Sequence, residues 1–198
     1  FVLNNDDFSL FVDKKIVSRD KMEAIPGIGI NTKNIIPSFN VESNQVIMLS
    51  RLIKNKGIYD FCNIAKEVKN DKPEIIFNLY GSEAEITKED LSEFINKALI
   101  QSPGFTNDPI QRIHEADIVI LPSYREGMPV TLLEAMACGK PCIGYNVPGC
   151  REVITDQETG FLIEKGDIAT FATKIIELME SKNQKNNMGK KARYFAET

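Results

Sequence analysis

The stretch DIVILPSYREGMPVTLLEAMACGKPCIGY, residues 117–145, contains the pattern that decides the fold. Its apolar runs Asp117–Leu121 and Cys142–Tyr145 predict two buried strands. Between them, residues 129–138 are expected to form a helix, because proline fits a first helical turn and Gly139 with Pro141 marks the position just past a helix end. A strand, a helix and a second strand in this order indicate a βαβ unit of a parallel sheet.

The same alternation continues along most of the chain. Further strands are expected at residues 46–50, 75–80 and 161–164, with a weak strand just before Phe105. Helices are expected at residues 57–70, 151–155 and 167–181, and a Thr87-x-x-Asp90 capping box opens another, with Leu91, Phe94, Ile95 and Ala98 as its buried positions. These elements predict an α/β fold: one Rossmann-like, doubly wound parallel sheet of about six strands with helices on both faces.

Three segments differ in pattern along the chain. Residues 1–38 do not follow the alternation, and their turn-rich part at residues 25–30 is expected to connect this domain to a preceding one that is missing. Residues 39–181 are expected to form the Rossmann-like domain. Residues 182–198 carry five basic side chains against one acidic, which predicts a solvated terminal helix, with a weak contact to a membrane surface as the alternative.

The composition excludes several classes of protein. The 198 residues carry 24 basic and 28 acidic side chains, a formal charge of −4, so no basic field draws the chain onto nucleic acid. No apolar run approaches the roughly 20 residues that span a bilayer, and we expect no transmembrane segment. Neither the spacing of the four cysteines nor the single histidine, His114, suits a zinc site or a hydrolase triad. Buried thiols and no bound metal are expected.

Polar residues with possible chemistry follow two of the expected strands. In a doubly wound sheet, ligands bind beyond the carboxyl ends of the strands, where helix N-termini present free N–H groups. Arg51 and Lys56 follow the strand at residues 46–50 and suit a diphosphate, although such a pair of cations can also be merely solvated. Gly127 lets backbone amides approach phosphate or sugar oxygens.

Two carboxylates accompany this glycine. Glu126 lies in the loop after the strand at residues 117–121, and Glu134 lies in the second turn of a helix that is otherwise almost entirely apolar. A carboxylate in such surroundings is costly unless hydroxyl or cationic groups contact it. Sugar or ribose hydroxyls are natural partners, and a partly exposed glutamate bonded to local backbone is the alternative.

Several motifs in this chain occur in a characteristic order. They are SRL (50–52) with KG (56–57), YGS (80–82), ADIVILPS (116–123), REGMP (125–129), LEAMACGKP (133–141), GCRE (149–152) and TGFL (159–162). In order and spacing they resemble the family-four retaining glycosyltransferases of the GT-B fold, over roughly residues 20–180. The most specific element is the Glu-x7-Glu pair, Glu126 and Glu134. The opening residues and the segment around Val147–Glu152 resemble the bacterial branch that builds capsule, O-antigen or lipid-linked glycans.

The resemblance implies a fold and a role for the chain. Such enzymes have two Rossmann-like domains, and this chain resembles the C-terminal one, which binds the nucleotide-sugar donor, preceded by the end of the acceptor-binding domain. It implies Arg51, Lys56 and Glu126 as catalytic residues, with the two cations on the donor diphosphate and Glu126 facing the donor sugar. The donor-binding residues that it implies are Gly81, Ser82, Phe105, Thr106, Gly127, Met128, Pro129, Val130 and Glu134. Among these, Glu134 would bind the ribose hydroxyls, and Phe105 with Thr106 would contact the base.

The resemblance also implies a reaction. A hexosyl or N-acetylhexosaminyl group, galactose-type in particular, would pass from a UDP-sugar to a saccharide or lipid-linked acceptor with retention of configuration and without a metal cofactor. The full-length protein would be cytoplasmic, with peripheral contact at the inner face of the bacterial plasma membrane, and this part alone would not transfer sugar. Two alternatives remain: a sugar-nucleotide epimerase or phosphorylase of the same fold, and a non-catalytic nucleotide-sugar binding module.

Overall fold

The computed structural model of the 198-residue chain describes residues 1–25 and 29–198. Its centre is a six-stranded, all-parallel sheet in the order β3-β2-β1-β4-β5-β6. The strands are β1 (Gln45–Leu49), β2 (Ile76–Tyr80), β3 (Gln101–Gly104), β4 (Ile118–Leu121), β5 (Cys142–Tyr145) and β6 (Gly160–Ile163). This is the strand order of a Rossmann fold, so the predicted fold class is confirmed.

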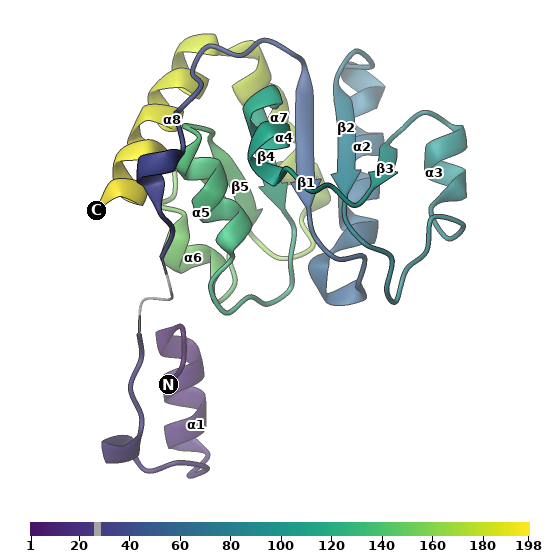
Figure 1. Ribbon diagram of the computed structural model, residues 1–198. Helices are drawn as coiled ribbons and strands as arrows, with labels where there is room; N and C mark the ends of the chain where they lie inside the picture. The colour runs from purple at the N-terminus through teal and green to yellow at the C-terminus, as the bar shows by residue number, and fades with distance from the viewer. Residues whose placement is uncertain (26–28) are drawn as a thin grey trace.

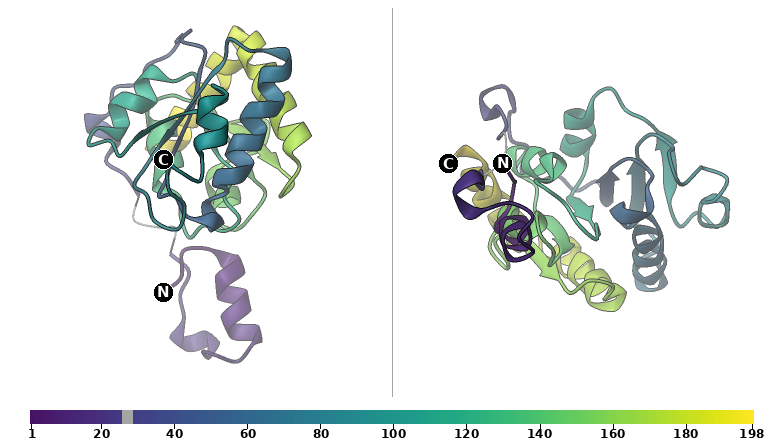
Figure 2. Two further views of the ribbon diagram at one scale, coloured as in Figure 1. Left: turned by 90° about the vertical axis from the view of Figure 1, so that its right-hand side faces the viewer. Right: turned by 90° about the horizontal axis from the view of Figure 1, so that it is seen from below.

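Helices cover both faces of the sheet (Figures 1 and 2). α2 (Ile58–Asp71) packs against α7 (Ile168–Glu180) on one face, and α5 (Val130–Ala137) packs against α4 (Pro109–Glu115) and α8 (Lys182–Glu197) on the other. The short α3 (Ser92–Asn96) lies beside the β3 edge, and α6 (Cys150–Val153) follows β5. β4 and β5 are buried along their whole length, because both of their faces carry helices.

Local sequence signals account for most helix ends. Gly139 follows α5 with φ 76°, a conformation that glycine adopts without strain, and Pro129 is the residue just before α5 rather than part of its first turn. Asp167 caps α7, where its Oδ1 accepts a hydrogen bond from the Thr170 amide at 3.0 Å. The turn-rich segment predicted at residues 25–30 includes residues 26–28, which lie outside the described part.

The prediction of a buried Ala98 is wrong. Thr87 and Asp90 make the reciprocal hydrogen bonds of a capping box, but the helix that follows ends at Asn96. Ala98 lies in the turn beyond it, exposed and with φ 54°. Only Leu91 of the four expected apolar positions is buried; Phe94 and Ile95 are half-buried. The short helix therefore presents no continuous buried stripe.

The terminal helix α8 is solvated on one face only. Its other face packs on α5 and buries Lys185, Met188, Gly189 and Ala192. Lys185 forms an ion pair with the buried Asp117 at the start of β4. A Cβ on Gly189 would lie 2.2 Å from the carbonyl oxygen of Gly139, so the helix approaches the end of α5 closely. α8 thus adds to the hydrophobic core around β4 and α5.

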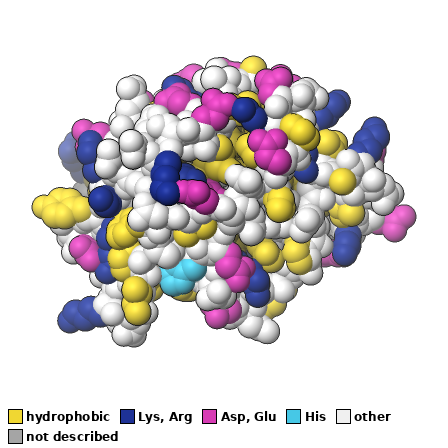
Figure 3. Space-filling view, turned by 90° about the horizontal axis from the view of Figure 1, so that it is seen from above, with side chains coloured by type: hydrophobic (Ala, Val, Ile, Leu, Met, Phe, Trp, Pro, Cys, Tyr) yellow, Lys and Arg dark blue, Asp and Glu magenta, His cyan; other side chains and the backbone are white. Residues whose placement is uncertain are grey.

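Residues 1–25 lie below the carboxyl ends of the strands in Figure 1 and contain α1 (Asn5–Asp13). A parallel backbone bridge between Val2 and Ala24 joins the two ends of this segment. At the opposite end of the molecule, around the amino ends of the strands, Figure 3 shows acidic and basic side chains intermingled. That face carries no field of a single sign.

Candidate functional site

The sheet changes direction between β1 and β4. The chain runs from β1 outward to β2, and from β4 outward to β5 on the other side, so the loops after β1 and β4 diverge from the same point. Such a switch point leaves a crevice beyond the carboxyl ends of the strands. The loop after β1 contains Arg51 and Lys56, and the loop after β4 contains Glu126.

These two loops are in direct contact. The amide of Tyr124 donates to the carbonyl oxygen of Asn55 at 2.9 Å, and the hydroxyl of Ser123 lies 3.3 Å from the same oxygen. Gly57 has φ 70°, and a Cβ there would lie only 1.8 Å from the carbonyl oxygen of Pro122. A glycine is therefore required at position 57 both by its backbone angle and by the closeness of the second loop.

Lys56 and Glu126 form the central ion pair of the site. Lys56 Nζ lies 2.6 Å from each carboxylate oxygen of Glu126, and the buried Ser123 hydroxyl donates to Oε1 at 2.5 Å. The side chain of Glu126 is 8% exposed and that of Lys56 25%. Limited access to water strengthens the attraction between the two charges but adds a desolvation cost, part of which the Ser123 hydroxyl offsets for the carboxylate.

Glu126 is also held from the side of β5. Its amide donates to the carbonyl oxygen of Pro148 at 3.1 Å. Gly149 has φ 88°, and a Cβ there would lie 2.5 Å from the Cβ of Glu126. The loop that carries Glu126 is therefore clamped between the turn at Lys56 and the segment after β5.

Glu134 points from the second turn of α5 and is half-buried. Burial raises the pKa of its carboxyl above the usual value. Within residues 1–25 and 29–198, no group donates a hydrogen bond to this carboxylate. The alternative of a glutamate bonded to local backbone is thus not what these residues show, and the carboxylate is available to hydroxyl groups.

Arg51 contributes a second cation at the same edge. Its side chain is exposed and makes no ion pair with any described residue. Gly81 follows β2, and a Cβ on it would lie 1.7 Å from the carbonyl oxygen of Ser50, so close strand packing already requires this glycine. The carbonyl oxygen of the exposed Ser82 accepts from the Leu52 amide at 2.9 Å.

The remaining predicted donor-binding residues lie after β3 and before α5. Phe105 is 68% exposed, and Thr106 Oγ1 accepts from the Asp108 amide at 3.2 Å. Pro129 is buried, Met128 is half-buried and Val130 is 37% exposed at the start of α5. No side chain among the described residues caps α5, which leaves its first N–H groups free for an anion. All predicted site residues thus lie beyond the carboxyl ends of β1–β4.

Residues 1–25 contact the same loop. Asp7 forms an ion pair with Arg125, and Asp6 lies 3.8 Å from Arg151. A Cβ on Gly127 would lie 3.0 Å from the Leu3 side chain, so packing by Leu3 also favours glycine at that position. The loop next to Glu126 therefore contacts the segment that precedes the Rossmann-like domain.

Sequence reasoning missed Ser123 and the buried contact between Asp60 and Tyr145. Ser123 could have been found, because a serine three residues before a buried glutamate can reach its carboxylate. Tyr145 Oη donates to Asp60 Oδ2 at 2.7 Å across a sequence separation of 85 residues. No local pattern indicates that pairing, which depends on the sheet order.

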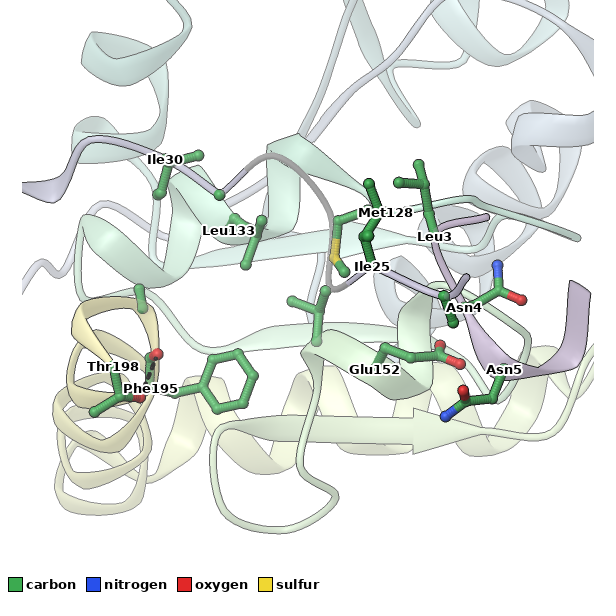
Figure 4. A pocket seen from close by; sticks show the side chains of 14 residues that line it. Leu3, Asn4, Asn5, Ile25, Ile30, Met128, Leu133, Glu152, Phe195 and Thr198 are labelled. Carbon is green, nitrogen blue, oxygen red and sulfur yellow. Dashed lines mark hydrogen bonds between the residues drawn. The ribbon is translucent and has the colours of Figure 1, made fainter. Parts of the chain in front are cut away.

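A cavity lies beside this site. It has a volume of about 720 Å³ and is lined by residues of the segment 1–25, the start of α5, α6 and the end of α8. Figure 4 shows apolar side chains around it, among them Leu3, Ile25, Leu133 and Phe195. Met128 is the one predicted site residue in its lining, so the cavity is distinct from the cluster at Lys56 and Glu126.

Two kinds of feature are absent from residues 1–25 and 29–198. No three His, Cys, Asp or Glu side chains there come together as a metal site. No helix there has both the length and the apolar character needed to cross a membrane. All four cysteines are buried as free thiols, as the sequence predicts.

Comparison with known proteins identifies relatives of the whole domain. Residues 31–195 match the family model described as "Glycosyl transferases group 1". The N,N'-diacetylbacillosaminyl-diphospho-undecaprenol alpha-1,3-N-acetylgalactosaminyltransferase of Campylobacter jejuni is 29% identical over 207 residues, which cover 97% of this chain and 54% of that protein. The UDP-Gal:alpha-D-GlcNAc-diphosphoundecaprenol alpha-1,3-galactosyltransferase of Escherichia coli is 28% identical and is matched over 91% of this chain and 51% of its own length.

A solved structure agrees in fold. A TarM variant from S. aureus superposes with a TM-score of 0.89 at 22% sequence identity, over 98% of this chain and 39% of that one. The chain spans about half the length of the relatives that it matches. It therefore has the fold of the C-terminal domain of a GT-B protein.

Proposed function

Because the chain belongs to the group 1 glycosyl transferases, we propose that it binds the nucleotide diphosphate sugar from which the whole protein transfers a glycosyl group. The observation that carries the proposal is the cluster at the switch point. At one edge of the sheet lie the exposed cation Arg51, the Lys56–Glu126 pair and Glu134, whose carboxylate has no hydrogen-bond partner among the described residues.

Arg51 and Lys56 are proposed to hold the donor diphosphate. Charge-assisted hydrogen bonds to phosphate oxygens are stronger than neutral ones, and the uncapped N-terminus of α5 adds N–H donors with a favourable dipole. As the bond between sugar and diphosphate breaks, negative charge grows on the leaving phosphate. Preorganised cations lower the free energy of that transition state, and they can do so without a metal.

The carboxylates are proposed to select the sugar and the ribose. Glu134 has no partner among the described side chains and can accept hydrogen bonds from two ribose hydroxyls. Glu126 would face the donor sugar, with the amides of Gly127, Met128 and Val130 on sugar or phosphate oxygens. Phe105 and Thr106 would contact the base, with Gly81 and Ser82 in the loop beside them.

The relatives support a class of donor and acceptor. The names of two relatives specify transfer of N-acetylgalactosamine or galactose to undecaprenol-linked saccharides, and one name specifies UDP-galactose as donor. We propose a UDP-linked hexose or N-acetylhexosamine as donor, a saccharide or lipid-linked acceptor, and retention of configuration. The acceptor would bind a preceding domain, so this chain alone would not transfer sugar. The whole protein would then act in bacterial surface polysaccharide synthesis at the inner face of the plasma membrane.

The experiment that tests the diphosphate site is calorimetric titration of the chain with UDP. Arg51→Ala should weaken UDP binding roughly ten-fold or more, because one charge-assisted contact is worth about 1.5–3 kcal/mol. Lys66→Ala, which removes an exposed charge from α2, is the control and should leave the affinity unchanged at physiological salt. Equal affinities for wild type and Arg51→Ala would contradict the assignment of Arg51.

A further inference from the structure

We propose that Asp60 and Tyr145 are positioning residues, whose hydrogen bond fixes Glu126 in the orientation that recognises the donor sugar. The inference rests on the proposed function, because it concerns the sugar part of the same site. Asp60 and Tyr145 contact each other and not Glu126. We propose that they act on Glu126 through the two segments that clamp its loop, the turn at Lys56 and the segment after β5.

The Asp60–Tyr145 contact joins two distant parts of the domain. Tyr145 ends β5 and is fully buried, and its hydroxyl donates to Asp60 in the first turn of α2 at 2.7 Å. Its ring packs against the rings of Tyr124 and Phe171, contacts that a phenylalanine ring at position 145 would also make. The hydroxyl is therefore what distinguishes the tyrosine, and it donates its proton to Asp60.

The ring of Tyr145 is fixed independently of its hydroxyl. It packs edge-on against Phe171, with ring centroids 5.6 Å apart, and stacks with Tyr124, at 6.3 Å and an interplanar angle of 13°. Lys165 Nζ lies over the Tyr124 ring, 4.4 Å from its centroid. Because Tyr124 belongs to the Glu126 loop, the stack connects that loop directly to β5.

The two partners of this hydrogen bond each lead to one side of Glu126. Asp60 comes three residues after Gly57, and the turn before Gly57 carries Lys56, which holds both oxygens of Glu126. Tyr145 comes three residues before Pro148, whose carbonyl oxygen accepts from the Glu126 amide. The contacts form a closed ring through α2, β5 and the Glu126 loop, and the Asp60–Tyr145 bond closes it.

Opening this ring should loosen Glu126 without touching the diphosphate contacts of Arg51. When a carboxylate is free to move, only a fraction of the molecules hold it in the orientation that meets a sugar hydroxyl. The apparent affinity for the sugar falls with that fraction. Recognition of the sugar should then weaken, while recognition of UDP should not. A merely structural role for Tyr145 would instead lower stability and leave the ratio of the two affinities unchanged.

The test compares affinities for UDP and for UDP-galactose or UDP-N-acetylgalactosamine, whichever binds wild type more tightly. In Tyr145→Phe, which keeps the packed ring, we expect the UDP affinity to stay within two-fold and the advantage of the UDP-sugar over UDP to fall about five-fold. Asp60→Asn keeps an acceptor oxygen for the hydroxyl and should retain most of that advantage. Tyr59→Phe removes the hydroxyl of an exposed neighbouring tyrosine and is the matched control. An unchanged ratio in folded Tyr145→Phe, or equal weakening of both ligands, would overturn the inference.

Hydrogen exchange of backbone amides tests the same ring without a ligand. In Tyr145→Phe the amides of Tyr124 and Glu126 should exchange about ten-fold faster, while the Val119 amide in the core strand β4 should not change. Unchanged exchange at Glu126 would overturn the positioning role. If wild type binds neither UDP nor a UDP-sugar, the proposed function fails, and the exchange rates alone decide the role of Asp60 and Tyr145.

Discussion

Lys56 and Glu126 neutralise each other's charge in a close ion pair. Lys56 Nζ contacts both carboxylate oxygens, and Ser123 donates to one of them. A diphosphate that binds Lys56 must therefore compete with Glu126, and sharing the ammonium group between them lowers the net gain in affinity. Arg51, which is exposed and has no ion-pair partner in the described part of the chain, pays no such cost.

The first prediction follows from this competition. Glu126→Gln removes the negative charge next to Lys56, so UDP should bind about three- to ten-fold more tightly, because the ammonium group is released to the diphosphate. Calorimetric titration of both proteins with UDP checks this. The same variant should bind a UDP-sugar no more tightly than UDP, since the proposed sugar contact is lost. Weaker UDP binding by Glu126→Gln would contradict the competition.

The second prediction concerns the ribose. Glu134→Ala should lower the affinity for UDP by roughly ten-fold, because hydrogen bonds between a charged carboxylate and ribose hydroxyls are each worth about 1.5–3 kcal/mol in a half-buried place. Inorganic pyrophosphate, which has no ribose, should bind wild type and variant equally. If both ligands lose affinity to the same extent, Glu134 acts on the diphosphate region or on the fold and not on the ribose.

At the scale of elements, close contacts between loops hold the site together. The turn at Gly57 lies directly against Pro122, and the loop after β4 bonds to Asn55 on one side and to Pro148 on the other. These contacts explain why glycines occur at positions 57, 81 and 149, where a Cβ would lie within 3 Å of neighbouring atoms. The loops therefore form a rigid frame for the charged side chains.

Gly57→Ala gives the third prediction. A Cβ 1.8 Å from the Pro122 carbonyl oxygen must displace one of the two loops, so the free energy of unfolding should fall by more than about 3 kcal/mol. Gly166→Ala is the matched control: its φ is 85°, but no atom lies within 4 Å, and about 1–2 kcal/mol of backbone strain is expected. Urea unfolding of the three proteins measures both values. Equal losses in the two variants would show that backbone strain alone explains Gly57.

Helices and strands could be predicted where the residues that mark them lie within a few positions of one another. The strands at β4 and β5 and the helix between them were predicted because apolar runs, prolines and Gly139 all act within a few residues. Ala98 was misplaced because helical spacing alone does not show where a short helix ends. The buried face of α8 was also missed, since it depends on packing against α5 and on the pairing of Lys185 with Asp117, 68 residues away.

The candidate site likewise has features that the sequence predicts and features that depend on contacts between distant residues. The sheet order brings Arg51, Lys56 and Glu126 to one edge, which the rule for parallel sheets predicts from sequence. The pairing of Lys56 with Glu126 could not be predicted, because it depends on how the two loops approach each other. The roles of these residues toward a donor stay predictions.

At the scale of the whole molecule, a second group of buried charges joins α8 to the sheet. Asp117 pairs with Lys185, and Asp117 Oδ2 also accepts hydrogen bonds from the Ser43 hydroxyl and the amides of Ser43 and Gln45. Lys140 is buried nearby and donates to the His114 carbonyl oxygen at 3.1 Å. Burial lowers the pKa of Lys140 to about 8, because the charged form loses its water.

The fourth prediction is a dependence of stability on pH. A lysine whose pKa is lowered in the folded state binds fewer protons there than in the unfolded chain between pH 8 and 10.5, so its contribution to stability rises with pH in that window. Lys140→Met should therefore be more stable than wild type at pH 7, and its advantage should shrink by up to about 1.4 kcal/mol per pH unit above pH 8. Urea unfolding under reducing conditions at pH 7, 8.5 and 9.5 measures the difference; the cysteines contribute equally to both proteins. A constant difference would contradict a lowered pKa.

The central claim is that the crevice between β1 and β4 binds a nucleotide diphosphate sugar. Titration of the 15N-labelled chain with UDP-N-acetylgalactosamine or UDP-galactose, followed by amide chemical shifts, tests it most directly. We expect saturable shifts at Arg51, at Gly81 and Ser82, and at residues 127–130 before and at the start of α5. The absence of shifts at millimolar ligand, or shifts confined to residues around the 720 Å³ cavity between α6 and α8, would contradict it.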